Sequence, residues 1–386
     1  MTAVRGAARG AQRVRLVDVA AAAGVSKSVA SRALADAPDI AEATKSRVSL
    51  VAQELGYQAS QRARWLGRRN GLRPAMQHAA LVSLQVPPEV LGASFLGPVL
   101  AGILSGAAEE GLELQHVMAR PEDGAPAEVL GRLVAQDRAD GLILLTFLPL
   151  TPADVAPLEA AGVPYVLVNR HFGPAAGPPV NCVTFEWEAA TRDAVERLAG
   201  AGHRHLACLL PDLDNCSVSD RAAGWRAGVR GLRLAPRDAP ILRYPGSPGV
   251  PADMEAGGRA LAERLLRDGL PEGGPVPTAI VGFNDWCALG VLRAAAAAGV
   301  RVPERLSVIG FDSTRVGYGT TPPLCSYRPR FIEMGRRAAG LLAAALRGQQ
   351  EGPRRIEVPV EFDCRGSCGP APPPEAGPSG PSAGRA

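Results

Sequence analysis

Hydrophobic positions recur at two different spacings along the chain, and the change of spacing divides it in two. Between Leu16 and Leu55 the apolar residues follow the period of a helix in three short segments. These segments predict three helices, over residues 16–23, 27–35 and 41–55. Gly24 separates the first two helices, and Ser26 is a favourable N-cap for the second. A unit this small has no room for a large core or a catalytic cleft.

After Pro74, short apolar runs of strand length alternate with helical patterns. Strands are predicted over residues 78–86, 112–118, 139–145, 163–169, 181–185, 205–210, 279–283 and 306–311. Helices are predicted over residues 99–110, 127–136, 152–161, 188–201, 222–231, 255–268 and 288–298. Such alternation is typical of right-handed βαβ units and open parallel sheets. Two sets of units, divided near residues 185–205, predict two similar lobes facing a cleft, with a ligand at the carboxyl ends of the strands.

Charge is distributed unevenly over the 386 residues. The formal net charge is +4, but residues 1–73 carry 13 Arg and Lys against 5 Asp and Glu. The remainder carries 29 against 33, so a basic head precedes a mildly acidic body. This pattern is typical of a nucleic-acid-binding module joined to a second unit, and a solvated basic tail is the alternative.

The sequence also excludes several classes of protein. No apolar stretch reaches the roughly 18 residues of a membrane span, and the basic N-terminus lacks the apolar segment of a secretory signal, which favours the cytoplasm. Seven cysteines, an odd number, favour reduced thiols over a disulfide framework. Cys364 and Cys368 form a C-x3-C pair, but no second pair or His completes a zinc site. We therefore expect no metal and no cofactor.

The predicted second helix carries side chains that suit a DNA major groove. Four of them lie on its polar face: Lys27, Ser28, Ser31 and Arg32. Arginine binds guanine through two parallel hydrogen bonds, lysine binds guanine or phosphate, and serine binds base edges or phosphates. Ser26 begins this helix and completes the set of candidate DNA contacts. A small helical bundle without a DNA-binding role is the alternative.

The run "VRLVDVAAAAGVSKSVASRAL", residues 14–34, resembles the N-terminal headpiece of the lactose/galactose repressor (LacI/GalR) family of bacterial transcription regulators. The Leu-x-Asp-Val-Ala, Ala-Gly-Val-Ser and Ser-Arg elements of the family are all present, and its Leu-Gly-Tyr follows at residues 55–57. The resemblance implies that Lys27 and Ser28 select operator bases and that Arg32 contacts DNA. Val29 replaces a threonine that touches phosphate in the family pattern.

The segment after Tyr57 resembles the family's hinge helix, which enters the minor groove and inserts an apolar wedge between bases. Residues 63–66, Ala-Arg-Trp-Leu, match the family's Ala-Arg-x-Leu. The resemblance implies Leu66 as the wedge and Arg64 as a partner of the DNA backbone. Such a wedge costs about a few kcal/mol of base stacking, which the contacts of bent DNA offset. The family's Pro-Asn is replaced by Ala59 and Ser60.

The resemblance continues through residues 14–368, and it is strongest over residues 284–312. It implies a core like the periplasmic binding proteins, in which Arg221 grips effector hydroxyls and Asn284 and Asp312 line the same site. An arginine fork with carboxylate and amide acceptors can hold a sugar or another polyol in a desolvated pocket. From the residues alone, a capping role for Asn284 and Asp312 and a structural ion pair for Arg221 are the alternatives.

Three further residues are candidates for the effector site: Phe95, Arg170 and Trp286. Arg170 follows a predicted strand, and Trp286 begins a helix at the mouth of another. The family has Asn-Pro-Phe-Phe at this place in the first lobe, whereas this chain has "GASFLG", in which only Phe95 matches. This segment therefore does not indicate which ligand binds. Trp225 is expected in the core of a lobe.

We therefore predict an α/β protein with a three-helix helix-turn-helix head and a two-lobed, periplasmic-binding-protein-like core of parallel sheets. The predicted parts are a disordered N-terminus (1–13), the DNA-binding domain (14–57), the hinge helix and linker (58–74), the effector-binding and dimerisation core (75–368) and a disordered tail (369–386).

The predicted function is that of a cytoplasmic, homodimeric transcriptional repressor that binds a near-palindromic double-stranded DNA operator. A small sugar or sugar derivative between the lobes is expected to control the operator affinity. The alternatives are a regulator of the same kind that responds to a non-sugar metabolite or a partner protein, or a solute-binding or enzymatic α/β protein with an added basic head. No Walker loop, nucleophile elbow or dinucleotide fingerprint is present, so we expect no enzymatic activity.

Overall fold

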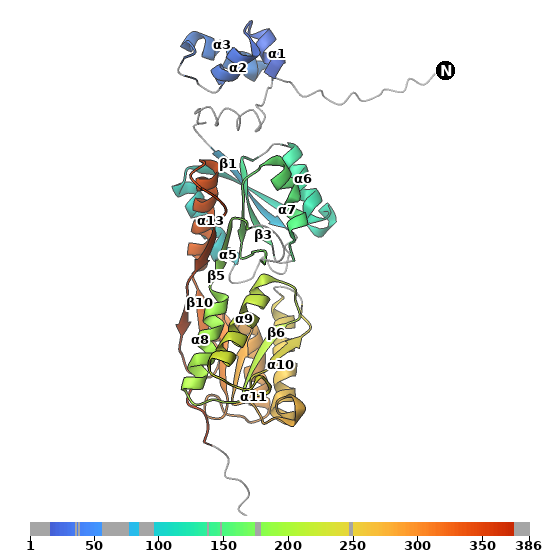
Figure 1. The fold of residues 1–386 in the computed structure, drawn as a ribbon, viewed down its shortest axis with the longest axis vertical. Helices are drawn as coiled ribbons and strands as arrows, with labels where there is room; N and C mark the ends of the chain where they lie inside the picture. Colours follow the sequence, from blue (N-terminus) through green and yellow to red (C-terminus); the bar gives the residue numbers. More distant parts are fainter. Residues whose placement is uncertain are drawn as a thin grey trace, which may run out of the picture.

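The computed structural model describes residues 16–34, 37, 39–55, 77–84, 96–136, 139–146, 149–173, 179–246 and 250–373. Figure 1 shows a small unit of helices apart from two α/β lobes, which follow one another along the long axis of the molecule. The predicted α/β class with a helical head is confirmed. Among the described residues no helix is both long and apolar enough to cross a membrane.

The head contains three short helices, α1 (Leu16–Ala22), α2 (Lys27–Leu34) and α3 (Glu42–Glu54). Gly24 follows α1 with a φ of +66°, a conformation that costs glycine little and lets the chain turn sharply into α2. Among the described residues of the head, the buried core cluster contains only small side chains: Val19, Ala20, Ala23, Ala30, Ala33, Val48 and Ala52. Because these side chains are small, the three helices can approach closely and bury a core despite their length.

The first lobe is built on a six-stranded sheet with the order β11-β5-β4-β3-β1-β2, in which all neighbouring strands are parallel. Its strands are β1 (Gln77–Leu84), β2 (Leu112–Ala119), β3 (Gly141–Thr146), β4 (Tyr165–Val168), β5 (Cys182–Phe185) and β11 (Arg355–Val358). Its helices are α5 (Leu96–Glu109), α6 (Pro126–Gln136), α7 (Pro152–Ala161) and α13 (Phe331–Leu346), with a short 3-10 turn η2 (Pro121–Asp123).

The second lobe repeats this plan with the strand order β12-β10-β9-β8-β6-β7. Its strands are β6 (Leu206–Pro211), β7 (Ile241–Tyr244), β8 (Ala279–Gly282), β9 (Ser307–Phe311), β10 (Cys325–Pro329) and β12 (Val360–Asp363), of which β12 pairs antiparallel with β10. Its helices are α8 (Trp187–Gly200), α9 (Cys216–Gly231), α10 (Pro251–Asp268), α11 (Asp285–Ala297) and α12 (Arg315–Tyr318), with 3-10 turns η3 (Pro236–Asp238) and η4 (Pro271–Gly273).

Helices cover both faces of each sheet, which explains why the central strands read as nearly continuous apolar runs. In the first lobe, Leu81 of β1 packs into the cluster with α5 and α13, whereas its neighbour Val82 packs with α6 and α7. In the second lobe, Cys208 of β6 faces α8 and α9, and Leu209 faces α10 and α11. One apolar run therefore fills two layers, because successive side chains of a strand point to opposite faces.

The chain crosses between the lobes three times. It leaves the first lobe after β5, returns after β10, and leaves again between β11 and β12. As a result, α13 packs on α5 of the first lobe although it follows almost the whole second lobe in sequence. The division predicted near residues 185–205 is therefore only the first of three crossings.

Six elements of the second half were not predicted from the sequence: β7, α12, β10, α13, β11 and β12. Three of them, β7, β11 and β12, are four-residue edge strands with mostly half-buried or exposed side chains. Edge strands of this kind lack the apolar run by which the other strands are found. The helix predicted at residues 222–231 in fact begins six residues earlier, at Cys216.

The first residues after the core do not behave as a free tail, although Gly369 was expected to begin one. The Gly369 backbone N–H donates to Ser307 Oγ at 3.0 Å, and the Gly369 carbonyl accepts from His203 Nε2 at 3.0 Å. The Ala371 backbone N–H donates to the Ala201 carbonyl at 2.9 Å. Residues 369–371 are thus held on the second lobe.

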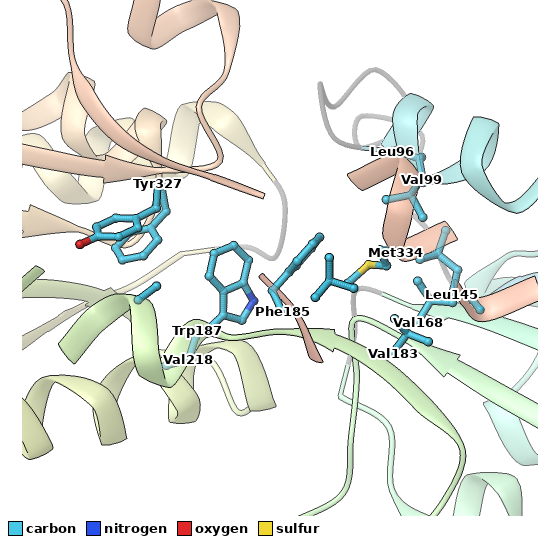
Figure 2. Packing of buried hydrophobic residues seen from close by; sticks show 14 of the residues in the cluster. Leu96, Val99, Leu145, Val168, Val183, Phe185, Trp187, Val218, Tyr327 and Met334 are labelled. Carbon is cyan, nitrogen blue, oxygen red and sulfur yellow. The ribbon is translucent and has the colours of Figure 1, made fainter. Parts of the chain in front are cut away.

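A single hydrophobic core runs through both lobes at the first crossing. Figure 2 shows Phe185 and Trp187 between the second-lobe side, where Tyr327 lies, and the first-lobe residues around Met334. The ring centroids of Phe185 and Trp187 are 5.1 Å apart, and those of Trp187 and Phe311 are 5.8 Å apart, both edge to face. This geometry is favourable for aromatic pairs, so the crossing is itself part of the packed core.

Helix pairs in both lobes approach closely because glycine stands at the contact. A Cβ atom on Gly224 of α9 would lie 2.1 Å from the backbone oxygen of Glu188 in α8. A Cβ atom on Gly335 of α13 would lie 2.3 Å from the backbone oxygen of Val99 in α5. Neither contact is possible for real atoms, so a larger residue forces the helices apart in a core without free volume.

We predict that Gly224→Ala destabilises the protein by about 1–3 kcal/mol, because the added methyl group overpacks the contact between α8 and α9. Gly231→Ala is the matched control: it lies in the same helix, but an added Cβ atom there meets nothing within 4 Å. Unfolding by urea or heat measures both variants. Equal stability of the two would show that the helices are not in the close contact described above.

Candidate functional site

The amino-terminal end of α2 forms an exposed polar surface on the head. Ser26 caps the helix as predicted, since its Oγ accepts a hydrogen bond from the Val29 backbone N–H at 3.2 Å. Lys27 and Ser28 occupy the first two helical positions and are exposed, and Ser31 is half-buried one turn later. An ammonium group and hydroxyl groups at a helix N-terminus suit a negatively charged partner such as DNA.

Arg32 lies on the same helix, and its side chain is 44% exposed. Its guanidinium group forms an ion pair with Asp39 in the turn before α3. An exposed pair of this kind contributes at most about 1 kcal/mol, so Arg32 can exchange Asp39 for a guanine or a phosphate at little cost. The two hinge candidates, Arg64 and Leu66, lie outside the described residues.

A cavity of about 100 Å³ lies between the two lobes. Residues at or just after the ends of parallel strands from both lobes line it: Thr146, Asn169, Arg170, Phe185, Phe283, Asn284 and Asp312. The other lining residues are Trp187, Leu213, Asn215, Ser217, Arg221, Met254 and Phe331. Open α/β sheets bind ligands at this edge, as the sequence predicted. Four predicted effector residues are brought together here: Arg170, Arg221, Asn284 and Asp312.

Arg221 provides the main positive charge of the cavity, and its side chain is only 3% exposed. Its guanidinium carbon lies 3.8, 4.6 and 4.8 Å from the ring centroids of Trp187, Phe283 and Phe311. Its Nη1 donates to the Ser217 carbonyl at 3.0 Å and also to Ser217 Oγ. The ring faces and the serine oxygens thus stabilise the cation where water is excluded. Burial lowers the pKa of Arg221 only to about 10, so the group stays charged at neutral pH.

Asp312 is the acidic partner of Arg221, with 4.0 Å between its Oδ1 and the Arg221 Nη2. At this distance the two groups attract each other without a direct hydrogen bond. Burial raises the pKa of Asp312 to about 6, and the charge of Arg221 opposes this effect. Asp312 and Ser313 have φ values of +87° and +48°, so this turn is strained for residues other than glycine. Strained turns of this kind are common where a side chain must be aimed at a ligand.

Asn284 and Arg170 line the cavity from opposite lobes. Asn284 caps α11, since its Oδ1 accepts from the Cys287 backbone N–H at 3.0 Å. A cap uses the carbonyl oxygen of the side chain, so the amide nitrogen can still donate to a ligand. Arg170 follows β4 and is buried, and burial lowers its pKa. The capping alternative for Asn284 is therefore compatible with a place in the cavity.

Trp286 does not line the cavity. It lies two positions after Asn284, about 200° further round the helix, and packs half-buried against the core of the second lobe. Phe95 lies outside the described residues. Trp225 is fully buried in the lobe core, as expected, and its Nε1 donates to the Ala239 carbonyl at 2.8 Å.

Asp285 is the first residue of α11; it is fully buried and does not line the cavity. Its buried carboxylate accepts hydrogen bonds from Ser326 Oγ at 2.6 Å, from the Thr314 backbone N–H at 2.5 Å and from Thr314 Oγ at 2.9 Å. These bonds hold the loop that carries Asp312 against the start of α11. Burial raises the pKa of Asp285 to about 7, although the bonds from Ser326 and Thr314 oppose this effect.

A polar contact joins the two lobes beside the cavity. His171, in the loop after β4, places its Nε2 2.9 Å from Oδ2 of Asp220 in α9. The Nη2 of Arg355 in β11 lies 3.8 Å from the same oxygen. Both partners of Asp220 come from the first lobe, so the contact holds the lobes together. No local sequence signal announces it, because His171 and Asp220 are 49 residues apart.

The cavity has the composition of a small-molecule binding site. Aromatic and aliphatic side chains form its walls, and its polar lining contains the guanidinium groups of Arg170 and Arg221, one carboxylate and three side-chain amides, those of Asn169, Asn215 and Asn284. Such groups fix the orientation of a ligand by hydrogen bonds. This mixture of hydrogen-bond donors and acceptors suits a molecule that has several hydroxyl groups.

Two family models match the chain. Residues 15–60 match the model described as "Bacterial regulatory proteins, lacI family", which covers the head. Residues 195–368 match the model described as "Periplasmic binding protein-like domain", which covers the second lobe and the returning elements.

Similar proteins extend over nearly the whole chain. The transcriptional regulator CelR of Thermobifida fusca is 29% identical over 92% of this chain and 98% of its own length. The lactose operon repressor of Escherichia coli is 29% identical over 87% of this chain and 86% of its own length. A solved CelR–cellobiose complex has a TM-score of 0.62 at 26% identity, over 92% of this chain and 100% of that one. The lac repressor dimer bound to operator and the anti-inducer ONPF has a TM-score of 0.63 at 26% identity, over 93% and 100%.

We predict that the carboxyl group of Asp312 titrates near pH 6. Because burial favours the neutral form, the folded state binds more protons than the unfolded state between about pH 4 and pH 6. The contribution of Asp312 to the free energy of unfolding is therefore complete below about pH 4 and is lost as the pH rises through about 6. Carbon NMR of the protein labelled at the aspartate carboxyl carbon measures the midpoint, with Asp312→Asn to assign the resonance. A midpoint at the ordinary value of about 4 would mean that the carboxyl group is solvated.

Proposed function

The chain belongs to the lacI family of bacterial regulatory proteins, and we propose that it is a sequence-specific transcriptional repressor controlled by a small sugar-like effector. The observation that carries the proposal is the convergence of Arg221, Asn284 and Asp312 on one cavity between lobes that are joined to a DNA-binding head. In this proposal the protein acts by binding and not by catalysis, and a DNA partner supports a cytoplasmic location.

The head reads DNA through the exposed end of α2. Lys27, Ser28 and Arg32 face bases or phosphates in the major groove, and Ser26 and Ser31 support the contact from the helix start and its next turn. A head of about 40 residues buries little DNA surface, so tight binding needs two heads and a near-palindromic operator with half-sites about one helical turn apart. A homodimer with hinge residues Arg64 and Leu66 in the minor groove between the half-sites meets this need.

The effector is a sugar or a sugar derivative held at the carboxyl ends of the strands. The Arg221 guanidinium and the Asp312 carboxylate stand 4.0 Å apart, so each has hydrogen-bonding capacity for a hydroxyl group. Asn284 and Arg170 add donors from the two lobes. The similarity to a regulator solved with cellobiose supports a sugar as the ligand class.

The size of the cavity indicates how the effector enters. Its volume of about 100 Å³ is smaller than the roughly 300 Å³ at which ligand pockets begin. The lobes must therefore rotate apart to admit a sugar, and the contact between His171 and Asp220 must break or shift. An effector that prefers one lobe arrangement changes the operator affinity by its differential affinity for the two arrangements. The three crossings are the points about which the lobes turn.

We predict that Arg32→Ala weakens binding to the specific operator by about 1–3 kcal/mol and relaxes its base preference, because an arginine that reads guanine is lost. Fluorescence anisotropy with an operator selected from random DNA measures the effect. Arg267→Ala, at the exposed end of α10, is the control and should bind as the unaltered protein does. An equal loss on operator and on random DNA would remove the base-reading role of Arg32.

We predict that Arg221→Met keeps operator binding but abolishes the response to the effector, because methionine fills the space without donating hydrogen bonds. The effector used is the first sugar of a panel, including cellobiose, that shifts the operator affinity of the unaltered protein. Calorimetry measures sugar binding and anisotropy measures DNA binding. Leu66→Ala is the converse variant, and it should weaken operator binding while sugar affinity stays nearly unchanged. A wild-type response in Arg221→Met contradicts the site, and a panel in which no sugar acts contradicts the effector class.

A further inference from the structure

Three cysteine thiols converge at the edge of the second lobe, away from the effector cavity. Cys325 is the first residue of β10, and Cys364 and Cys368 follow β12. The three Sγ atoms all lie within 4.8 Å of one another, and those of Cys325 and Cys368 are 3.2 Å apart. By itself, the C-x3-C pair was not enough to predict a metal site. The antiparallel pairing of β12 with β10 brings in the third thiol, which lies 39 residues earlier in the chain.

The loop that carries the pair is held rigidly against β9 and β10. Ser367 Oγ donates to the Val308 carbonyl at 2.6 Å and accepts from the Cys325 backbone N–H at 2.8 Å. The Ser367 side chain is fully buried, so these bonds are shielded from water. The Ser367 carbonyl in turn accepts from the Val308 backbone N–H at 2.7 Å. The positions of the thiols are therefore set by the fold before any ligand binds.

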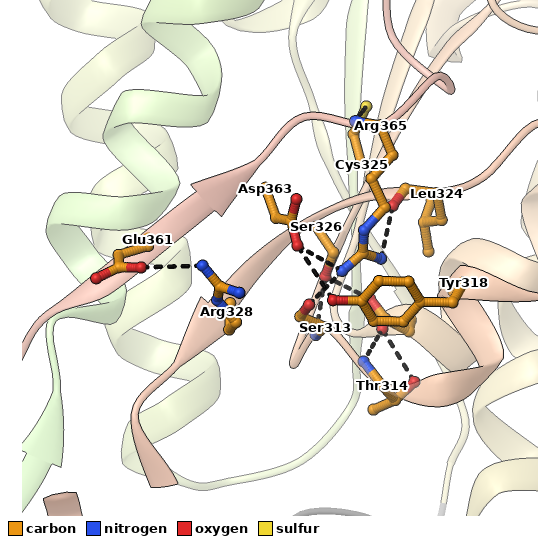
Figure 3. Close-up of polar contacts among 12 residues, drawn as sticks. Ser313, Thr314, Tyr318, Leu324, Cys325, Ser326, Arg328, Glu361, Asp363 and Arg365 are labelled. Atoms are coloured by element: carbon orange, nitrogen blue, oxygen red, sulfur yellow. Dashed lines mark hydrogen bonds and ion pairs between the residues drawn. The ribbon is translucent and has the colours of Figure 1, made fainter.

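Arg365 fastens the same loop from the other side, as Figure 3 shows. Its Nη1 donates to the Leu324 carbonyl at 3.0 Å, next to Cys325. Its Nη2 bonds to Asp363 Oδ2 at 2.8 Å and to Ser313 Oγ, and its guanidinium carbon lies 3.6 Å from the centroid of the Tyr318 ring. A loop tied at both ends of the thiol cluster loses little conformational entropy when it binds an ion.

The surroundings of Cys325 provide the hydrogen bonds that a metal-bound thiolate needs. The backbone N–H of Arg365 donates to Cys325 Sγ at 3.2 Å, and the Gly366 backbone N–H also donates to it. Hydrogen bonds from such outer partners orient a ligating atom and hold its charge. Cys364 is exposed, so an ion can reach the cluster from solvent.

We propose that Cys325, Cys364 and Cys368 form a binding site for a thiophilic d¹⁰ cation, with Zn²⁺ as its representative. Tetrahedral zinc with Zn–S bonds of about 2.3 Å places its sulfur ligands about 3.8 Å apart. The sulfurs reach this spacing by shifts of less than about 1 Å, whereas a disulfide would have to bring two of them to about 2.05 Å and leave the third thiol unused. Three protein ligands leave the fourth position to water. The three thiols release their protons on binding, so binding strengthens as the pH rises.

The test is a titration of the reduced, full-length protein with Co²⁺ and then Zn²⁺ under anaerobic conditions. Cobalt bound by thiolates gives a charge-transfer absorption, which zinc abolishes as it displaces cobalt. We expect one ion per chain and a higher melting temperature with zinc, since an ion that binds only the folded state stabilises it. Cys364→Ser and Cys368→Ser should each lower the zinc affinity by more than about tenfold.

Cys216→Ser is the matched control, because it also removes one half-buried thiol of the second lobe but lies outside the cluster. It should bind zinc as the unaltered protein does. The proposal is overturned if the reduced protein binds no ion, or if the two cluster variants and the control bind zinc equally. It is also overturned if mass spectrometry finds a stable disulfide between Cys325 and Cys368 in place of metal binding.

Discussion

Three crossings of the polypeptide between the lobes constrain the rest of the core. Each sheet is parallel through its centre, so its strands end along one edge, and the crossings bring the two edges face to face. Short connections can rotate but cannot lengthen, so the lobes turn about the line of crossings and not freely. Phe185 and Trp187 lie on this line and also form a wall of the cavity. Any rotation therefore repacks the aromatic cluster and reshapes the cavity in the same movement.

The buried guanidinium group of Arg221 places a positive charge at the junction between the lobes. A cation removed from water destabilises the fold unless other groups replace its hydration. Aromatic faces and Ser217 do so in part, but among the described residues Arg221 Nε has no hydrogen-bond partner and Asp312 stays at 4.0 Å. The guanidinium group therefore stays charged, and hydrogen bonds to a ligand can stabilise it further. Asp285 supports the arrangement from behind, since it holds the loop on which Asp312 stands.

The sequence predicted the features that depend on local pattern. The three head helices, the central strands and the cap at Ser26 follow from periodicity and capping chemistry, and the structure agrees. The family pattern brought Arg221, Asn284 and Asp312 into one set, although their spacing says nothing about their proximity. What could not be predicted depends on distant partners. The returning helix α13 packs on α5, and Asp220 meets His171, only because of the crossings. Trp286 was predicted to line the cavity but does not, because its position on α11 directs its side chain toward the core of the second lobe.

The two lobes exchange helices with each other through the crossings. In each lobe the first four strands have the same spatial order, and the helix that follows the fifth strand packs on the helix that follows the first strand of the other lobe. Thus α8 follows β5 but packs on α9, and α13 follows β10 but packs on α5. The two lobes are thus related by an approximate internal symmetry of their topology. Asn169 after β4 and Asp312 after β9 occupy equivalent positions in it, and both have a positive φ. At these matching positions the cavity presents an amide from one lobe and a carboxylate from the other, so a ligand meets two different halves.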